Sequence, residues 1–204
     1  MTRSATRGKE KRQRLVEGAR QLVYQQGLER TTLADVAQVA DVPPGNVYYY
    51  FKTKDDLVDA AIDAHVQEIE TMLASLERRH RTPRARLKAL VRAFIEQRDM
   101  AAERGCPHGS LCQELDKRDD ELQHAARRLI DVPLRWAQSQ FSLMGRRDAA
   151  DLAVALISAY QGVSLLANTL RDPGLMLREG RRLERWIDSL EPGPRAVESR
   201  SVKR

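Results

Sequence analysis

Apolar residues recur every three or four positions along most of the chain, a spacing that predicts amphipathic helices. The first such segment is expected at about residues 9–26, and Gly27 follows it where a left-handed residue would end a helix. No run of alternating Val, Ile and Thr indicates a strand. The pattern therefore predicts an all-α fold of about nine helices.

Residues 32–57 predict two short helices, a tight corner and the start of a third helix. Thr32 is placed to cap the first of them, with Asp35 three residues later as the returning partner of a capping box. The proline pair at 43–44 must break that helix and suits the opening of the next one. Gly45 lets the backbone come close to a partner. This pattern is typical of a helix-turn-helix motif.

The second helix of the motif carries three consecutive tyrosines, Tyr48–Tyr50. They cannot all face one core, so at least two are expected to point outward. Their hydroxyls, beside Lys52 and Lys54, suit contacts to phosphates and base edges. The alternative is that this helix only packs a small core, and for Val47 and Phe51 that interpretation is the better one. Tyr48 is suited to both roles.

The motif resembles the TetR family of transcriptional repressors, closely over about the first third of the chain and only in layout beyond it. The matching positions are Thr32, Val36, Ala37, Ala40, Val42, Gly45, Val47, Tyr48, Phe51, Lys54 and Leu57. The resemblance implies a homodimer that binds an inverted-repeat DNA operator and responds to a small ligand. Two motifs related by a twofold axis must then meet successive major grooves.

The resemblance also implies which residues contact DNA. Base contacts are expected from Pro44, Gly45 and Tyr48, and phosphate contacts from Thr32, Asn46, Tyr49, Tyr50 and Lys54. Many relatives carry Ser and Lys or Arg where this chain has Pro43 and Pro44. A capping hydroxyl and a guanine-recognising side chain are therefore missing at those positions.

The rest of the chain predicts further helices, which join the motif to a ligand-binding and dimerisation domain. They are expected at about 53–80, 83–105, 106–115, 122–145 with a kink at Pro133, 148–170 with a close helix approach at Gly162, and from Pro173 to about residue 190. The expected domains are a DNA-binding domain at 1–52 with a basic mobile arm at 1–8, a helical domain at 53–190, and a disordered tail at 191–204.

The net charge of +6 is concentrated at the two ends. Residues 1–14 hold six Lys or Arg against one Glu, and residues 191–204 hold four against two, so residues 15–190 carry about −1. A nonspecific architectural DNA binder would need a basic surface throughout, which the nearly neutral body disfavours. The N-terminal segment should add a salt-dependent phosphate contribution.

Other functional classes lack their sequence signals. The four histidines are scattered along the chain, and no phosphate loop, nucleophile elbow or His-Glu-x-x-His pattern occurs. No cofactor is expected, and a helical enzyme is only a remote alternative. His65, on an apolar stripe, is expected to be a core histidine. The Cys-x-His-x3-Cys spacing from Cys106 matches no common zinc pattern. No secretory signal occurs and the apolar run at 152–167 is too short for a bilayer, so a cytoplasmic protein is expected.

A mainly apolar effector pocket is expected within the helical domain, and dimerisation through the last two long helices, because residues 148–170 are apolar on more than one face. The candidate ligand-binding residues are Phe94, Leu111, Trp136, Phe141, Tyr160 and Gln161. The alternative for each of them is that it only fills the core.

Cys106 stands between Gly105 and Pro107, which places it at or near the N-cap of a helix. The positive end of the helix dipole and the unpaired amides there favour a thiolate, so we expect a lowered pKa and, as a hypothesis, a redox or electrophile sensor. The alternative is an unreactive core cysteine. Cys112, in the same helix, is expected to be a small buried residue too far away for a disulfide.

Overall fold

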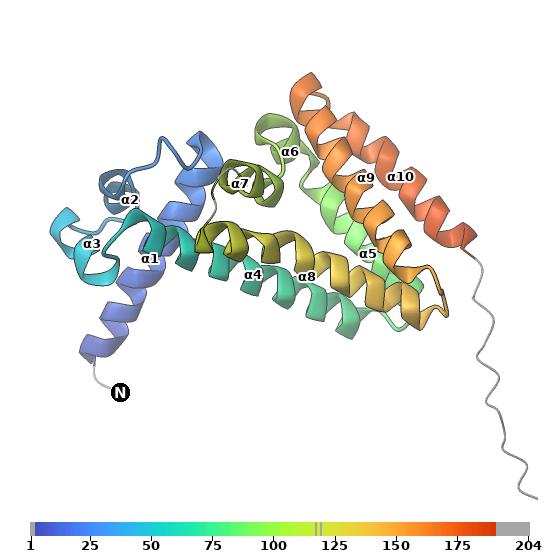
Figure 1. The fold of residues 1–204 in the computed structure, drawn as a ribbon, viewed down its shortest axis with the longest axis horizontal. Helices are drawn as coiled ribbons and strands as arrows, with labels where there is room; N and C mark the ends of the chain where they lie inside the picture. Colours follow the sequence, from blue (N-terminus) through green and yellow to red (C-terminus); the bar gives the residue numbers. More distant parts are fainter. Residues whose placement is uncertain (1–2, 117, 119, 191–204) are drawn as a thin grey trace, which may run out of the picture.

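The computed structural model describes residues 3–116, 118 and 120–190, and these residues form ten α-helices and no strand (Figure 1). The prediction of an all-α fold is confirmed. The helices are α1 (Arg3–Gln26), α2 (Leu33–Val39), α3 (Pro44–Tyr50), α4 (Lys54–Arg79), α5 (Pro83–Glu96), α6 (Arg98–Arg104), α7 (Pro107–Leu115), α8 (Glu121–Leu143), α9 (Ala149–Leu170) and α10 (Gly174–Ser189).

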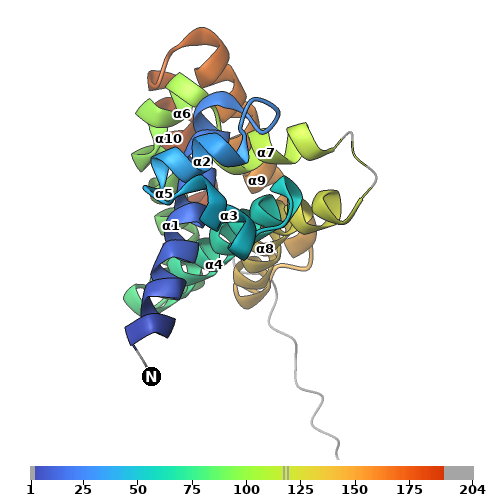
Figure 2. The same ribbon diagram turned by 90° about the vertical axis from the view of Figure 1, so that its left-hand side faces the viewer.

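Helices α1, α2 and α3 pack around a small core together with the start of α4 (Figure 2). The core is formed by buried residues that recur at helical spacing: Leu15, Val16, Ala19, Leu22, Val36, Ala37, Ala40, Val42, Val47, Phe51, Leu57 and Ala61. From Ile62 onward, the buried residues of α4 belong to a second and larger core. One continuous helix therefore joins the two cores.

The larger core lies among α4, α5, α8, α9 and α10, with α7 packed between α8 and α1. Gly180 allows α10 to cross α5 closely, because a Cβ there would come within 2.1 Å of the Ile95 Cδ1 atom. In Figure 1, α6 and α7 lie between the α1–α3 unit and the α9–α10 pair. Of these two helices, α6 packs against α9 and α7 packs against α1.

Two expected boundaries were wrong. Helix α1 begins at Arg3, so residues 3–8 are helical and not a mobile arm. Arg and Ala have high helix propensity, and extending an existing helix needs no new nucleus. The helix expected at 83–105 is divided at Gln97, whose φ of −90° and ψ of 6° end α5 and open α6. Residues 1–2 and the expected tail at 191–204 lie outside the described residues.

Helix α9 differs from expectation in two ways. Gly162 was expected to bring two helices together, but no atom outside its own helix backbone lies within 4 Å of a Cβ built there. The helix is apolar and 22 residues long, so the segment is not too short to cross a membrane. The core helix of a soluble protein meets the same criterion, and one face of α9, including Ala153, Leu156 and Tyr160, is buried against its neighbours.

Candidate DNA-binding surface and effector region

Local hydrogen bonds shape the turn between α2 and α3. The expected capping box is present: the Asp35 amide donates to Thr32 Oγ1 at 3.1 Å, and the Thr32 amide donates to the Asp35 carboxylate at 3.0 Å. The Thr32 hydroxyl also donates to the Asp35 carboxylate, at 2.7 Å, and this bond together with the one from the Thr32 amide holds the pKa of Asp35 below its usual value. Asp41 adopts a left-handed φ of 51°, and Pro44 opens α3 as its first residue. The sequence thus places the corner at residues 41–44.

Helix α3 has one buried and one exposed face. Val47 and Phe51 are buried, which confirms their core role, whereas Tyr48 and Tyr49 are 57% and 79% exposed. Nothing lies within 4 Å of a Cβ built at Gly45, so the backbone there is open to a partner. Six of the eight candidate DNA-binding residues are exposed: Thr32, Pro44, Gly45, Asn46, Tyr48 and Tyr49.

The other two candidates are half-buried. The Tyr50 ring lies edge-on to Tyr49, with ring centres 5.0 Å apart. Lys54 Nζ donates to the Glu29 carbonyl at 3.3 Å and lines a groove that also includes Glu114 of α7. Lys54 therefore belongs both to the motif and to its contact with the helical half, which the sequence did not indicate.

The six candidate effector residues divide between two places. Near α6 and α7, Phe94 stacks on Tyr160 with ring centres 3.7 Å apart. Gln161 follows Tyr160 on α9, and Leu111 is buried on α7. On α8, Trp136 Nε1 donates to Glu77 at 2.8 Å, and Phe141 is fully buried with its ring 5.9 Å from that of Trp186. These six residues do not share one described cavity.

Cys106 is the N-cap of α7 and is buried. Three groups are placed to donate to its Sγ atom: the Gly109 amide at 3.4 Å, the Tyr160 hydroxyl at 3.6 Å and the Gln161 amide at 3.7 Å. Burial is the main cause that raises the pKa of Tyr160. Cys112 is half-buried, its Sγ donates to the Ala126 carbonyl at 3.3 Å, and burial raises its pKa to about 11. The two thiols therefore differ in environment.

A polar junction joins α1, α4 and α7. Arg20 of α1 lies 3.4 and 3.2 Å from the two ring nitrogens of His65 on α4, and it also contacts the carboxylates of Glu17 and Glu68. The His108 ring on α7 lies edge-on to His65 at 5.2 Å. Burial is the largest cause that lowers the pKa of His65 to about 3 and that of His108 to about 4. Both imidazoles are therefore neutral near pH 7.

Further long-range bonds connect the helical half to the motif. The Tyr24 hydroxyl of α1 donates to the Gly105 carbonyl at 2.9 Å. The Leu28 amide donates to the Glu114 carboxylate at 2.6 Å. Arg118, after α7, pairs with Asp55 in the first turn of α4 at 2.6 Å. Sequence periodicity gave no signal for these contacts, because their partners are 63 to 86 residues apart.

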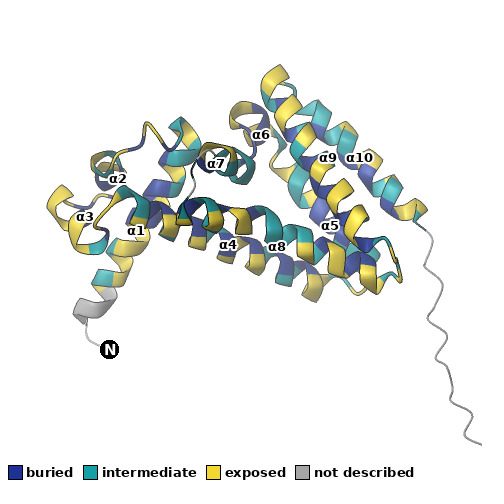
Figure 3. Ribbon diagram, viewed as in Figure 1, coloured by how far each residue is buried: buried dark blue, intermediate teal, exposed yellow. Residues whose placement is uncertain are grey.

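Helix α9 leaves an apolar face uncovered (Figure 3). Its large exposed residues are aliphatic: Val154, Leu165, Leu166 and Leu170 are 51%, 60%, 52% and 62% exposed. Gly162 lies between them, with open space above it. An aliphatic face of this kind is typical of a protein–protein contact.

The buried and exposed faces of α3, after a capped α2, define a helix-turn-helix DNA-binding protein. Two family models match the chain: "Bacterial regulatory proteins, tetR family" over residues 15–61 and "Tetracyclin repressor-like, C-terminal domain" over residues 83–182. The chain belongs to the TetR family of transcriptional regulators. Such proteins are not typically enzymes.

The relatives agree with this assignment. The chain is 26% identical over 197 residues to the HTH-type transcriptional regulator TtgR of Pseudomonas putida, covering 92% of each protein. A TetR transcriptional regulator from Chloroflexus aurantiacus has the same fold, with a TM-score of 0.80, 22% identity and coverage of 90% of this chain and 97% of that one. The reduced form of Escherichia coli NemR is similar in fold, with a TM-score of 0.75, 18% identity and coverage of 86% and 96%.

Proposed function

We propose that this chain is a homodimeric repressor that binds an inverted repeat in double-stranded DNA and leaves it when a small apolar or amphipathic effector binds. The outward face of α3 carries the proposal. Tyr48, Tyr49 and the open backbone at Gly45 are exposed together, as expected of a helix that enters the major groove. Thr32, Pro44, Asn46, Tyr50 and Lys54 complete the proposed contact surface.

A footprinting experiment tests this proposal directly. Duplexes selected from a random pool should converge on an inverted repeat, and the protein should protect both half-sites at a separation of about 34–36 Å or a multiple of it. Uniform protection without a preferred sequence would instead indicate an architectural DNA binder. Turnover of a bound small molecule would support the remote enzyme alternative.

The proposed dimer pairs the last two long helices of two copies. The aliphatic face of α9 supports this arrangement, because residues of this type gain free energy when a second copy removes them from water. The exposed face of α10 is different, since it presents Arg178, Arg181, Arg182 and Arg185. We therefore propose that α9 forms the centre of the interface and the arginines of α10 form its rim.

The proposed effector site lies around α6, α7 and α9, where Phe94, Leu111, Tyr160 and Gln161 lie, with Trp136 and Phe141 as more distant members. A ligand that favours the DNA-incompetent spacing of the two motifs would release DNA with a coupling of about 1 to 3 kcal/mol. Leu111→Trp fills this region and should abolish the ligand response. An unchanged response would contradict the location. The protein is proposed to act in the cytoplasm without a metal or another cofactor.

A second candidate function is thiol sensing by Cys106, which three donor groups around Sγ favour. The solved structure of the neighbour NemR is that of a reduced form. In a Cys112→Ser variant, Cys106 should react with iodoacetamide faster than a free thiol at neutral pH, and its oxidation should change operator affinity. Slower labelling or unchanged affinity would reject the sensor.

A further inference from the structure

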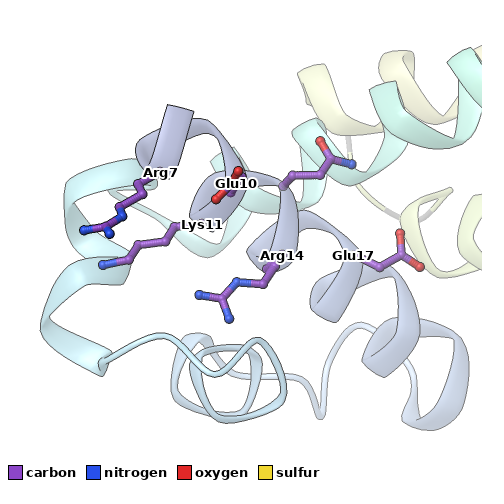
Figure 4. A pocket seen from close by; sticks show the side chains of 6 residues that line it. Arg7, Glu10, Lys11, Arg14 and Glu17 are labelled. Atoms are coloured by element: carbon purple, nitrogen blue, oxygen red, sulfur yellow. The ribbon is translucent and has the colours of Figure 1, made fainter. Parts of the chain in front are cut away.

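The N-terminal part of α1 carries a row of basic residues that precedes the segment matched by the DNA-binding family model, which begins at residue 15. Arg7, Lys11 and Arg14 recur at intervals of four and three, so they lie along one side of the helix. Figure 4 shows their side chains extending to the same side of α1, while Glu17 points away from them. They line an open surface groove.

Contacts with the motif hold this part of α1 beside the recognition helix. The Arg12 guanidinium lies 5.0 Å from the centre of the Phe51 ring, which follows α3. A Cβ built at Gly8 would lie 3.9 Å from the Tyr50 hydroxyl at the end of α3. Arg14 pairs at 3.4 Å with Asp41, in the turn before α3. The basic row therefore runs along a helix that touches both ends of the α3 segment.

The basic groups in this row are available for an anion. Among the described residues, neither Arg7 nor Lys11 has a salt-bridge partner, and the Arg14 pair involves an Asp41 side chain that is 99% exposed. A pair so open to water contributes little and exchanges easily. Of the two acidic residues in the groove, Glu17 is paired with Arg20 at 2.9 Å, which leaves Glu10 against three cations.

We infer that Arg7, Lys11 and Arg14 form a second DNA contact, which binds the sugar-phosphate backbone bordering the major groove that α3 enters. The inference rests on the proposed function. The major groove is about 12 Å wide, so an element packed beside the recognition helix meets the phosphates that border it. The row would fix the orientation of the motif on the duplex and strengthen binding to any sequence, because phosphate contacts carry no base information.

The salt dependence of binding tests the inference. With the selected operator duplex, Kd is measured from 50 to 300 mM salt for the wild type, for each of Arg7→Ala, Lys11→Ala and Arg14→Ala, and for the triple variant. Each single change should reduce the slope of log Kd against log salt by about one unit, and the triple variant by about three. Hydroxyl-radical footprints of the triple variant should lose protection at flanking sugars while the central half-site stays protected.

Lys9→Ala is the matched control. It removes the same charge, but two positions from Arg7 or Lys11 correspond to about 200° around the helix, so Lys9 lies on the other side of α1. Its slope should stay close to that of the wild type. An unchanged slope in the triple variant would overturn the inference. So would a reduction of the slope in Lys9→Ala as large as that in each of the three single variants.

The inference and the proposed function can fail separately. If no operator is selected from the random pool, sequence-specific repression fails. The same slopes, measured on a random-sequence duplex of about 30 base pairs, still test the basic row, because phosphate contacts do not depend on sequence. If an operator is selected and footprinted but the triple variant keeps the wild-type slope, only the inference fails.

Discussion

Helices α3 and α9 each leave a face uncovered, and the two faces differ in chemistry. The exposed face of α3 consists of tyrosines with hydroxyl groups next to lysines, whereas that of α9 consists of valine and leucines. Aromatic rings with a hydroxyl can contact bases and phosphates, while aliphatic side chains offer only area to be removed from water. Two similar amounts of exposure therefore support different proposed partners, DNA for α3 and a second copy of the chain for α9.

The largest expected effect is on the α9 face. Leu166→Glu would place a buried, unpaired charge in the interface twice by symmetry, at a cost of about 3–5 kcal/mol or more. Sedimentation at micromolar concentration should then show a monomer. Leu143→Glu is the control, because Leu143 is 65% exposed on α8 and outside this face, so it should leave the dimer intact. A wild-type monomer under these conditions would contradict the dimer.

Acid should lower the free energy of unfolding through the polar junction of α1, α4 and α7, which contains His65 and His108. The folded-state pKa values of His65 and His108, about 3 and about 4, lie below the unfolded value near 6.5, so the unfolded chain binds protons first as the pH falls. Their contribution to stability is therefore intact above about pH 6.5 and decreases from there down to about pH 4 for His108 and about pH 3 for His65. At pH 5 the loss should reach about 2 kcal/mol for each histidine.

Urea unfolding at pH 7 and pH 5 measures this loss. His108→Gln keeps a polar side chain without the titrating ring, so the difference between the two pH values should shrink by roughly half. An unchanged difference would show that Arg20, Glu17, Glu68 and other groups dominate the acid response.

The next effect concerns the α3 face. Tyr49→Ala should weaken operator binding by about 1–2 kcal/mol, because it removes an exposed ring and its hydroxyl from the proposed contact. Tyr49→Phe separates the two contributions, since it keeps the ring. Gel-shift titration gives both affinities. Wild-type affinity in Tyr49→Ala would show that α3 does not dock through this face.

The smallest effect is expected at Lys54. Lys54→Ala should weaken binding to all sequences and reduce the salt slope by about one unit, as for a single phosphate contact. Lys88→Ala provides the comparison, because Lys88 pairs with Asp188 in the helical half, and its removal should not change the slope. Equal slopes for all three proteins would exclude a phosphate contact at Lys54.

The features that the sequence predicted well depend on neighbours in the chain. The capping box at Thr32 involves a residue three positions later, and the N-cap at Cys106 follows from the glycine before it and the proline after it. The break at Gln97 was missed because no glycine or proline marks it. Helical periodicity separates core positions such as Val47 and Phe51 from exposed ones, whereas the individual DNA-binding candidates were assigned from the resemblance to the TetR family.

The contacts that the sequence did not predict join distant segments. The bond from the Leu28 amide to Glu114 and the pair between Arg118 and Asp55 form only when α7 packs against the motif. Phe94 and Tyr160 stack, yet Phe141 lies elsewhere, because helix crossing decides which apolar faces meet. Periodicity assigns a residue to the core without identifying its neighbours.

The length of helix α4 converts a small tilt at one end into a large displacement at the other. Its 26 residues, at a rise of 1.5 Å each, form a lever about 39 Å long with one end in each core. A tilt of about 5° around the far end displaces the near end by about 3 Å, and in a symmetric pair the two displacements add. This displacement is several times the width, about 0.5 Å, of the 2.7–3.2 Å range within which a hydrogen bond to DNA forms. In the proposed dimer, a tilt of about 5° in each α4 would therefore move both recognition helices out of register with the duplex.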